Sequence, residues 1–126
     1  MDQATLVNLD VNAGRKILDA LDEAQIKVAV ALWMISSDYE DWRLVLCLPT
    51  LDQTQMLKTY QKVADVARGR FAQMLPPILI LPAKDTFIKE LRRIFGKAKD
   101  VTGMRLGGQT IGNRYISDAY VYRIQK

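Results

Sequence analysis

Carboxylates are the side chains best suited to catalysis in this sequence, because it contains no histidine and only one cysteine. Three of them fall within four consecutive positions, and a fourth lies in a strand-like segment far downstream. Carboxylates that a fold brings together can hold Mg²⁺ for phosphoryl transfer or nuclease chemistry. Acidic residues are also the ordinary composition of a turn between two strands. The candidate catalytic residues are Asp38, Glu40, Asp41 and Asp118.

Asp118 is the most unusual of these acids, since apolar positions flank it within a predicted strand. An acid in such a place requires a cationic partner, and Arg43 and Arg105 are the candidates. The missing histidines exclude His-dependent triads, His proton shuttles and the usual zinc ligand sets. We therefore expect no cofactor and no resident metal, and an enzyme only under the carboxylate hypothesis.

Cys47 is the single cysteine, so the chain cannot form an intramolecular disulfide or a cysteine-based zinc site. It alternates with Val45 in an apolar segment. That position predicts a small buried side chain rather than a reactive thiol.

Positive charge gathers in the second half of the chain. Residues 1–63 contain six Lys or Arg and nine Asp or Glu, whereas residues 64–126 contain twelve and five; the overall charge is +4. Lys89, Arg93 and Lys97 recur every four residues, which places them on one ridge of a predicted helix. Such a ridge can follow the phosphates of a nucleic acid, but it is also the polar face that any amphipathic helix needs. The predicted binding patch comprises Lys89, Arg92, Arg93, Lys97, Lys99, Arg105 and Arg114.

Tyrosines alternate with arginines near the end of the chain. Tyr120 and Tyr122 are two residues apart in a predicted strand and share one of its faces. Paired aromatic side chains can stack on unpaired bases. The same alternation packs a strand against a helix, with the hydroxyl groups reaching water, and we favour this packing interpretation.

Apolar periodicity predicts the elements that must position these residues. The first helix begins near Asp10 or Asn12, and strands follow at 28–35 and 42–48. The segment Thr50–Gln53 has the pattern of a capping box before a long helix. Its apolar positions run from Met56 to Phe71, and Pro76 and Pro77 break it. A short strand at 78–81 and a third helix from Lys84 or Asp85 come next. The apolar positions of the third helix are Phe87, Ile88, Leu91, Ile94, Phe95 and Ala98.

The remainder predicts a hairpin of two strands, 104–111 and 114–124, joined by a type II′ turn at Gly112 and Asn113. The expected fold is therefore one α+β domain over residues 1–126. Its elements follow the order α-β-β-α-β-α-β-β, and three helices pack with a mixed sheet of about five strands. Two of the predicted strands are apolar on both faces and only three helices are available, so we expect a second copy to cover part of the sheet as a homodimer.

Three blocks of this pattern, DVNAGRKILDALDEAQI, YEDWRLVL and ISDAYVYR, resemble a group of small single-domain prokaryotic proteins that have no assigned activity. The resemblance implies a free-standing bacterial domain and brings no residue roles with it.

The sequence favours a non-catalytic binding or adaptor domain whose basic second half contacts a nucleic acid or an acidic protein. The carboxylate-based enzyme and a structural subunit of a larger complex remain the alternatives. No apolar run approaches the ~20 residues of a membrane helix, and the N-terminus has no signal-peptide pattern, so we expect a cytoplasmic protein without a membrane partner.

Overall fold

The computed structural model describes residues 8–36, 41–50, 54–69 and 76–126, and these ranges form the expected α+β fold. Three helices and a mixed sheet follow one another in the predicted order, with the strand expected at 104–111 divided into two short ones. In the described ranges, no helix has the length and apolar character needed to cross a membrane. The elements are α1 (Asn8–Glu23), β1 (Val30–Ser36), β2 (Arg43–Cys47), α2 (Met56–Arg68), β3 (Ile78–Ile80), α3 (Thr86–Phe95), β4 (Arg105–Leu106), β5 (Gln109–Ile111) and β6 (Arg114–Ile124).

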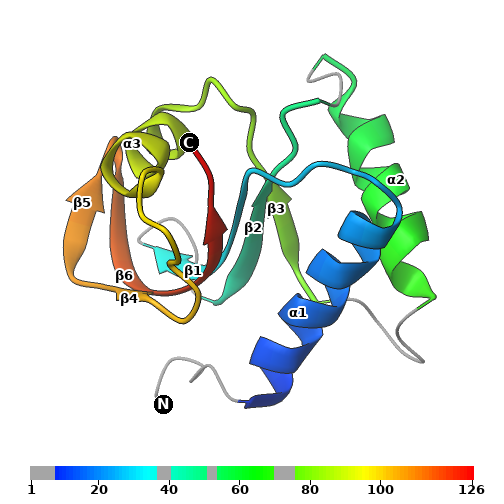
Figure 1. Ribbon diagram of the computed structural model, residues 1–126, viewed down its shortest axis with the longest axis horizontal. Helices are drawn as coiled ribbons and strands as arrows, with labels where there is room; N and C mark the ends of the chain where they lie inside the picture. The colour runs from blue at the N-terminus through cyan, green and yellow to red at the C-terminus, as the bar shows by residue number, and fades with distance from the viewer. Residues whose placement is uncertain (1–7, 37–40, 51–53, 70–75) are drawn as a thin grey trace.

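The central strand of the sheet is β1. The strand order is β3-β2-β1-β6-β4, and β5 pairs with β6. β1 is antiparallel to both β2 and β6, whereas β3 runs parallel to β2 at one edge. The longest strand, β6, curves away from β1 so that β4 and β5 extend beside α3 (Figure 1). The strand nearest the end of the chain therefore pairs with the centre of the sheet.

Both faces of β1 are covered within one chain. Ala31 and Trp33 point into a cluster with α1 and α2, while Leu32 and Met34 point into a second cluster with α3 and the curved part of β6. All seven residues of β1 are buried. The expectation of a homodimer rested on a sheet face that lacked a cover, and this arrangement removes that reason. The dimer itself stays a prediction.

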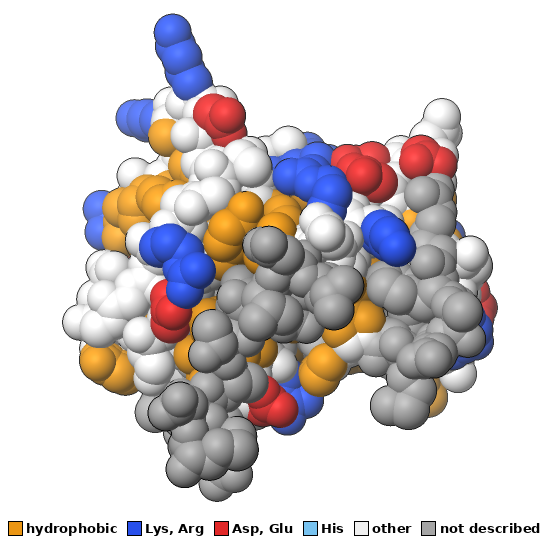
Figure 2. Space-filling model, turned by 90° about the horizontal axis from the view of Figure 1, so that it is seen from below, with side chains coloured by type: hydrophobic (Ala, Val, Ile, Leu, Met, Phe, Trp, Pro, Cys, Tyr) orange, Lys and Arg blue, Asp and Glu red, His pale blue; other side chains and the backbone are white. Residues whose placement is uncertain are grey.

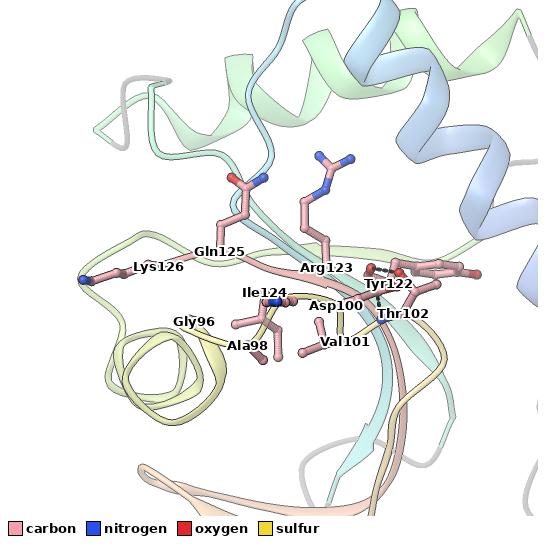
Figure 3. Close-up of a pocket in the computed structure, with 11 residues that line it drawn as sticks. Gly96, Ala98, Asp100, Val101, Thr102, Tyr122, Arg123, Ile124, Gln125 and Lys126 are labelled. Carbon is pink, nitrogen blue, oxygen red and sulfur yellow. Dashed lines mark hydrogen bonds between the residues drawn. The ribbon is translucent and has the colours of Figure 1, made fainter.

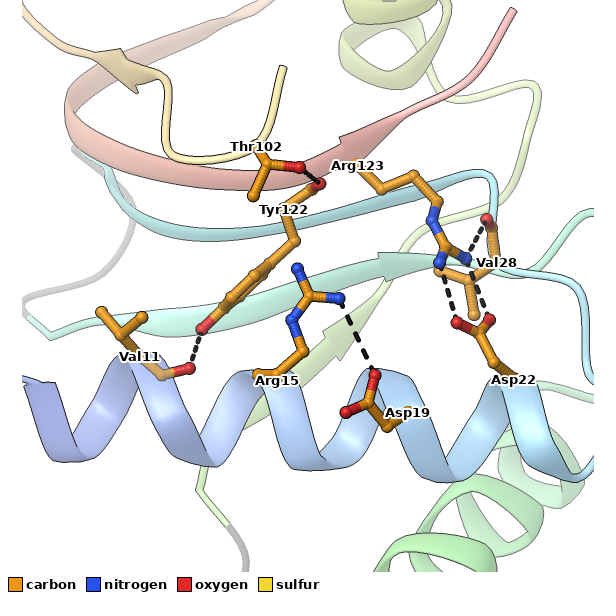
Figure 4. Close-up of polar contacts among 8 residues, drawn as sticks. All are labelled: Val11, Arg15, Asp19, Asp22, Val28, Thr102, Tyr122 and Arg123. Carbon is orange, nitrogen blue, oxygen red and sulfur yellow. Dashed lines mark hydrogen bonds and ion pairs between the residues drawn. The ribbon is translucent and has the colours of Figure 1, made fainter. Parts of the chain in front are cut away.

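A β-bulge in β6 directs two consecutive side chains toward α1. The pairing of β6 with β1 shifts by one residue where Ala31 faces Arg123 and Leu32 faces Val121, which leaves Tyr122 as the extra residue. A bulge of this kind bends the strand and re-aims its side chains. Tyr122 and Arg123 both reach α1 in consequence (Figure 4).

Tyr122 is the centre of a buried hydrogen-bond chain. Its hydroxyl accepts a hydrogen bond from Trp33 Nε1 at 3.0 Å and donates one to the carbonyl oxygen of Val11. Gly14 lies against both rings, since a Cβ there would be 2.8 Å from Trp33 Nε1. These two hydrogen bonds join β1, β6 and α1. Because Gly14 has no side chain, α1 can lie directly against Trp33 and Tyr122.

The start of α2 differs from the sequence prediction. The helix begins at Met56 with Gln55 at its N-cap, and the Gln55 side chain makes no capping hydrogen bond. Thr50 lies in a turn after β2, and residues 51–53, including Gln53, are outside the described ranges. The prediction of a helix that starts at a Thr50–Gln53 capping box is wrong, because the chain leaves the sheet through that turn before it becomes helical.

The start of α3 agrees with the prediction. The Asp85 carboxylate accepts hydrogen bonds from the backbone N–H groups of Phe87 at 2.9 Å and Ile88 at 3.3 Å. The prediction that Ile94 packs in the core is wrong. It is 47% exposed, because β5 and β6 cover the side of α3 that carries Phe87, Ile88 and Leu91.

The turn between β5 and β6 has glycine where the backbone requires it. Gly112 has φ of 62°, and Gln25 is the only described non-glycine residue with positive φ. Asn113 therefore has negative φ, as a type II′ turn needs. A Cβ on Gly112 would also lie 2.9 Å from the carbonyl oxygen of Thr86, so glycine allows the turn to contact the start of α3.

Substitution of Tyr122 by phenylalanine tests the contribution of the buried hydrogen bonds to stability. Tyr122→Phe removes the acceptor for Trp33 Nε1 and the donor to Val11, so we expect a loss of about 1–3 kcal/mol in the free energy of unfolding. Urea denaturation followed by tryptophan fluorescence measures it. Tyr115→Phe is the matched control, because Tyr115 is 45% exposed. Equal free energies of unfolding for the two variants would contradict a stabilising role of the Tyr122 hydrogen bonds.

Two glycine-to-alanine changes test the close approach of α1. Alanine favours a helix interior, yet at position 14 its Cβ would collide with the rings of Trp33 and Tyr122. We expect Gly14→Ala to destabilise the fold by about 1–3 kcal/mol, the usual cost of overpacking. At Gly69 nothing lies within 4 Å of an added Cβ, so Gly69→Ala should be neutral or slightly stabilising. Thermal unfolding of both variants decides the matter.

Candidate anion-binding surface

The structure separates the described candidate acids. Asp38 and Glu40 lie outside the described residues. Asp41 is exposed, and its carboxylate accepts a hydrogen bond from the N–H of Trp42 at 2.9 Å. Asp41 precedes β2 on one side of β1, whereas Asp118 faces Ile35 from β6 on the other side. Two strand spacings of about 4.8 Å thus separate the two strands that carry them.

Asp118 has the cationic partner that its position requires. Arg105 Nε donates to Asp118 Oδ1 at 3.3 Å, and Arg105 Nη2 donates to Oδ2. The N–H of Ala119 also donates to Oδ1 at 2.8 Å. Of the two candidate partners, Arg105 is the one paired with this carboxylate. No group of three His, Cys, Asp or Glu side chains suited to a metal lies in the part of the chain that the structure describes.

Arg105 does not lie on the same side of the sheet as α3. It faces Tyr120 across the β4–β6 pair, and directly paired residues point to the same face of a sheet. Tyr120 packs against the cluster of α1 and α2, whereas the next residue of β4, Leu106, belongs to the cluster of α3. The predicted patch is therefore divided between the two faces.

The arginines of the predicted patch make contacts within the protein. Arg93 pairs with Glu90 one turn away; this contact lowers the pKa of Glu90 and raises the pKa of Arg93. Arg92 donates to the carbonyl oxygens of Gln125 at 3.0 Å and Lys126 at 2.9 Å. Arg114 is only 17% exposed and lies 4.0 Å from the carboxylate of Asp85. The contacts of Arg92 and Arg114 hold α3 and its N-cap against neighbouring segments, whereas the Arg93 pair lies within the helix.

Three lysines of the patch are exposed and have no ion pair with any described residue: Lys89, Lys97 and Lys99. Lys89 is on α3 itself. Because α3 ends at Phe95 and Gly96 is its C-cap, Lys97 follows the helix instead of continuing the predicted ridge. Lys97 and Lys99 are thus carried by the segment that connects α3 to β4.

A hollow of about 310 Å³ lies beside this connecting segment (Figure 3). Its walls are residues from 96–102 on one side and the end of the chain from Tyr122 on the other. Lys99, Arg123 and Lys126 are the basic residues of the lining, and Asp100 is its acid. The guanidinium group of Arg123 points away from the 96–102 segment (Figure 3). The Asp100 carboxylate accepts the backbone N–H of Thr102 at 2.9 Å, which lowers its pKa.

Arg123 is held in place at this hollow. Its Nη1 and Nη2 donate to the two carboxylate oxygens of Asp22 on α1, at 3.0 and 2.8 Å (Figure 4). The contact with Asp22 raises the pKa of Arg123. Arg123 and Lys126 could not be expected beside Lys99 from local patterns, because only the fold brings residues 96–102 beside the last strand.

One face of the molecule, shown in Figure 2, carries charges of both signs. On the face shown in Figure 2, Lys and Arg side chains are interspersed with Asp and Glu side chains. Lys89, Lys97 and Lys99 are the cations of the predicted patch that have no ion pair with a described residue, and Lys99 lines the hollow. Such groups can donate hydrogen bonds to, and attract, phosphate or carboxylate oxygens.

Tyr122 packs in the core and the partly buried Tyr120 packs against the same cluster, as the packing interpretation predicted. Their ring centroids are 5.3 Å apart with the planes at 70°, an edge-to-face contact. The Tyr122 hydroxyl differs from the prediction, because it is hydrogen-bonded to Trp33 and Val11 instead of reaching water. Tyr122 is 4% exposed, and Arg15 of α1 lies over its ring at 5.2 Å. A base cannot stack on the ring of Tyr122, because α1 already covers it.

Cys47 is buried on β2, among the residues that contact α3. Burial raises the pKa of its thiol; Arg92 lowers it in part, and Asp85 adds to the rise. A buried thiol that resists ionisation is not a nucleophile. The residue acts as a small apolar side chain.

No protein-family model, no curated protein and no solved structure matches this chain. The resemblance to small prokaryotic proteins thus adds no residue role to the surface described above.

The rate at which a reagent labels Cys47 measures how well the folded core protects this buried thiol. We expect a thiol reagent to modify the native protein about 100-fold more slowly than the urea-unfolded chain, because reaction requires opening of the core. The folded-state pKa is raised, so the free energy of unfolding should fall as the pH rises above the thiol's unfolded value of about 8.5. Fast labelling of the native protein at neutral pH would contradict a buried thiol.

Proposed function

We propose that this chain is a non-catalytic binding domain that contacts the phosphates of a nucleic acid. The contacts are made by its lysine surface, which consists of Lys89 on α3 and of Lys97 and Lys99 after it. The observation that supports the proposal most is the difference between two kinds of cation. The arginines of the predicted patch are engaged with carboxylates and carbonyls, while Lys89, Lys97 and Lys99 are exposed without an ion pair among the described residues.

Lysines of this kind suit a particular mode of binding. Each ammonium group is a flexible point charge without the planar geometry that reads base edges. Contacts of this type give affinity through counterion release and little sequence preference. Three such contacts predict a log–log slope of affinity against salt of about −2 to −3. The hollow beside Lys99 offers space for one phosphate group.

An acidic protein surface is the alternative partner for the same lysines. It requires the same charges but no regular phosphate spacing, so binding to a polyanionic peptide instead of an oligonucleotide would favour it. No specific observation favours the carboxylate enzyme, because Asp118 is paired with Arg105 and is separated from Asp41 by β1.

A salt titration with matched variants tests the proposal. We expect a labelled oligonucleotide to bind at about 50 mM salt and to lose most of its affinity by about 200 mM, as judged by fluorescence anisotropy. Lys97→Gln/Lys99→Gln should reduce the affinity roughly 3- to 10-fold at low salt, since two phosphate contacts disappear.

The control for this experiment removes the same charge elsewhere. Lys27 and Lys62 are exposed and lie outside the lysine surface, so Lys27→Gln/Lys62→Gln should leave the affinity nearly unchanged. An equal loss in both double variants would mean that only net charge matters. Absence of binding by the wild-type protein at low salt would end the nucleic-acid proposal.

A further inference from the structure

The outer face of α2 carries the most exposed large apolar side chain in the described part of the chain. Leu57 is 72% exposed, compared with 47% for Ile94 and 45% for Tyr115. It lies in the first turn of α2, whose other side packs Thr59, Val63 and Ala67 into the protein. Burying an isolated leucine would remove a substantial apolar area from water.

An apolar hollow of about 330 Å³ lies farther along the same helix. It is bounded by α2 on one side and by Pro76 and the edge strand β3 on the other. Ala64 contributes only a methyl group, which leaves room between the helix and the strand. The lining residues are Tyr60, Gln61, Val63, Ala64, Pro76 and Ile78.

Leu57 and Ala64 are seven residues apart, so they lie two helical turns apart on one face of α2. If two copies of α2 pack antiparallel about a twofold axis between Tyr60 and Gln61, Leu57 of one copy faces Ala64 of the partner subunit. The same operation places the partner's Leu57 over Ala64 of the first copy. A projecting side chain and the hollow that receives it are thus present on one patch, as an isologous interface requires.

The charges on this helix are complementary in the same arrangement. Lys58 follows Leu57 and Asp65 follows Ala64, so contact between Leu57 and the partner's Ala64 brings Lys58 near the partner's Asp65. Asp65 is exposed, and its contact in the monomer is Arg68 at 3.7 Å on the same helix. Two symmetric pairs of opposite charge therefore flank the apolar contact and favour the antiparallel orientation.

We propose that the face of α2 carrying Leu57 and Ala64 docks a second copy of this chain as a symmetric antiparallel dimer. One helix face is a small interface, so the dimer should be weak and concentration-dependent. α2 and α3 cover opposite faces of the sheet, as Figure 1 shows, so the lysine surface of each protomer stays open. The inference does not depend on nucleic-acid binding.

Sedimentation velocity over a wide concentration range gives the first test. We expect wild-type protein to change from monomer to dimer as its concentration rises. Leu57→Asp should weaken dimerisation at least 10-fold without unfolding the chain, because Leu57 is at the surface. The control is Ile94→Asp, which places the same charge at an exposed apolar position on α3 and should leave the dimer unchanged.

Disulfide trapping tests the orientation directly. In Leu57→Cys/Ala64→Cys, the two positions of one helix are about 10 Å apart, too far for a disulfide within one chain. Oxidation should therefore produce a covalent dimer on a denaturing gel, and Leu57→Cys alone should produce much less. Cys47 is buried in both variants and serves as an internal control.

Three results would overturn the proposal. The first is a wild-type protein that stays monomeric at all concentrations, even if another molecule binds the hollow beside α2. The second is a dimer that survives Leu57→Asp or dissociates with Ile94→Asp. The third is a double-cysteine variant that cross-links no better than the single one, which would exclude the antiparallel arrangement.

Discussion

The hydrogen-bond chain through the Tyr122 hydroxyl is the interaction on which the arrangement of the layers depends. It links Trp33 on the central strand to Val11 on the first helix, and it does so inside the apolar layer between them. Arg123 fixes the same helix a second time through Asp22. The two attachment points are eleven residues apart, about 16 Å along the helix axis. Both exist because one extra residue in β6 turns two neighbouring side chains to the same face.

The same strand shapes the surface on the other side of the sheet. Beyond Arg123 the chain runs past the end of α3, where Arg92 holds the carbonyl oxygens of Gln125 and Lys126. This contact sets one wall of the hollow, and the segment after α3 forms the other. A guanidinium group in the basic half thus has a structural task, while the lysines beside it keep their charge exposed. The arginines and lysines therefore differ in what they contact, and the number of positive charges alone does not reveal this difference.

Much of the fold could be predicted from local patterns, because apolar periodicity and turn residues act over a few positions. The Asp85 cap, the Gly112 turn and the two-sided burial of β1 are examples. The start of α2 was misplaced because the Thr50–Gln53 pattern looks the same in a turn as at a helix end. Ile94 and Arg105 could not be placed, since exposure and sheet face depend on a bulge and a curvature set by distant residues. The walls of the hollow and the division of the basic patch are long-range properties of the same kind.

The pairing of β1 with β6 also has a consequence for how the chain is made. β1 spans residues 30–36, and its partner spans 114–124, so the centre of the sheet joins segments that leave the ribosome far apart in time. Until the last strand emerges, β1 has one open edge and apolar side chains on both faces. Contacts of such sequence separation slow folding and leave nascent sheet edges exposed to other chains. The centre of the sheet is therefore completed only after residues 114–124 have been synthesised.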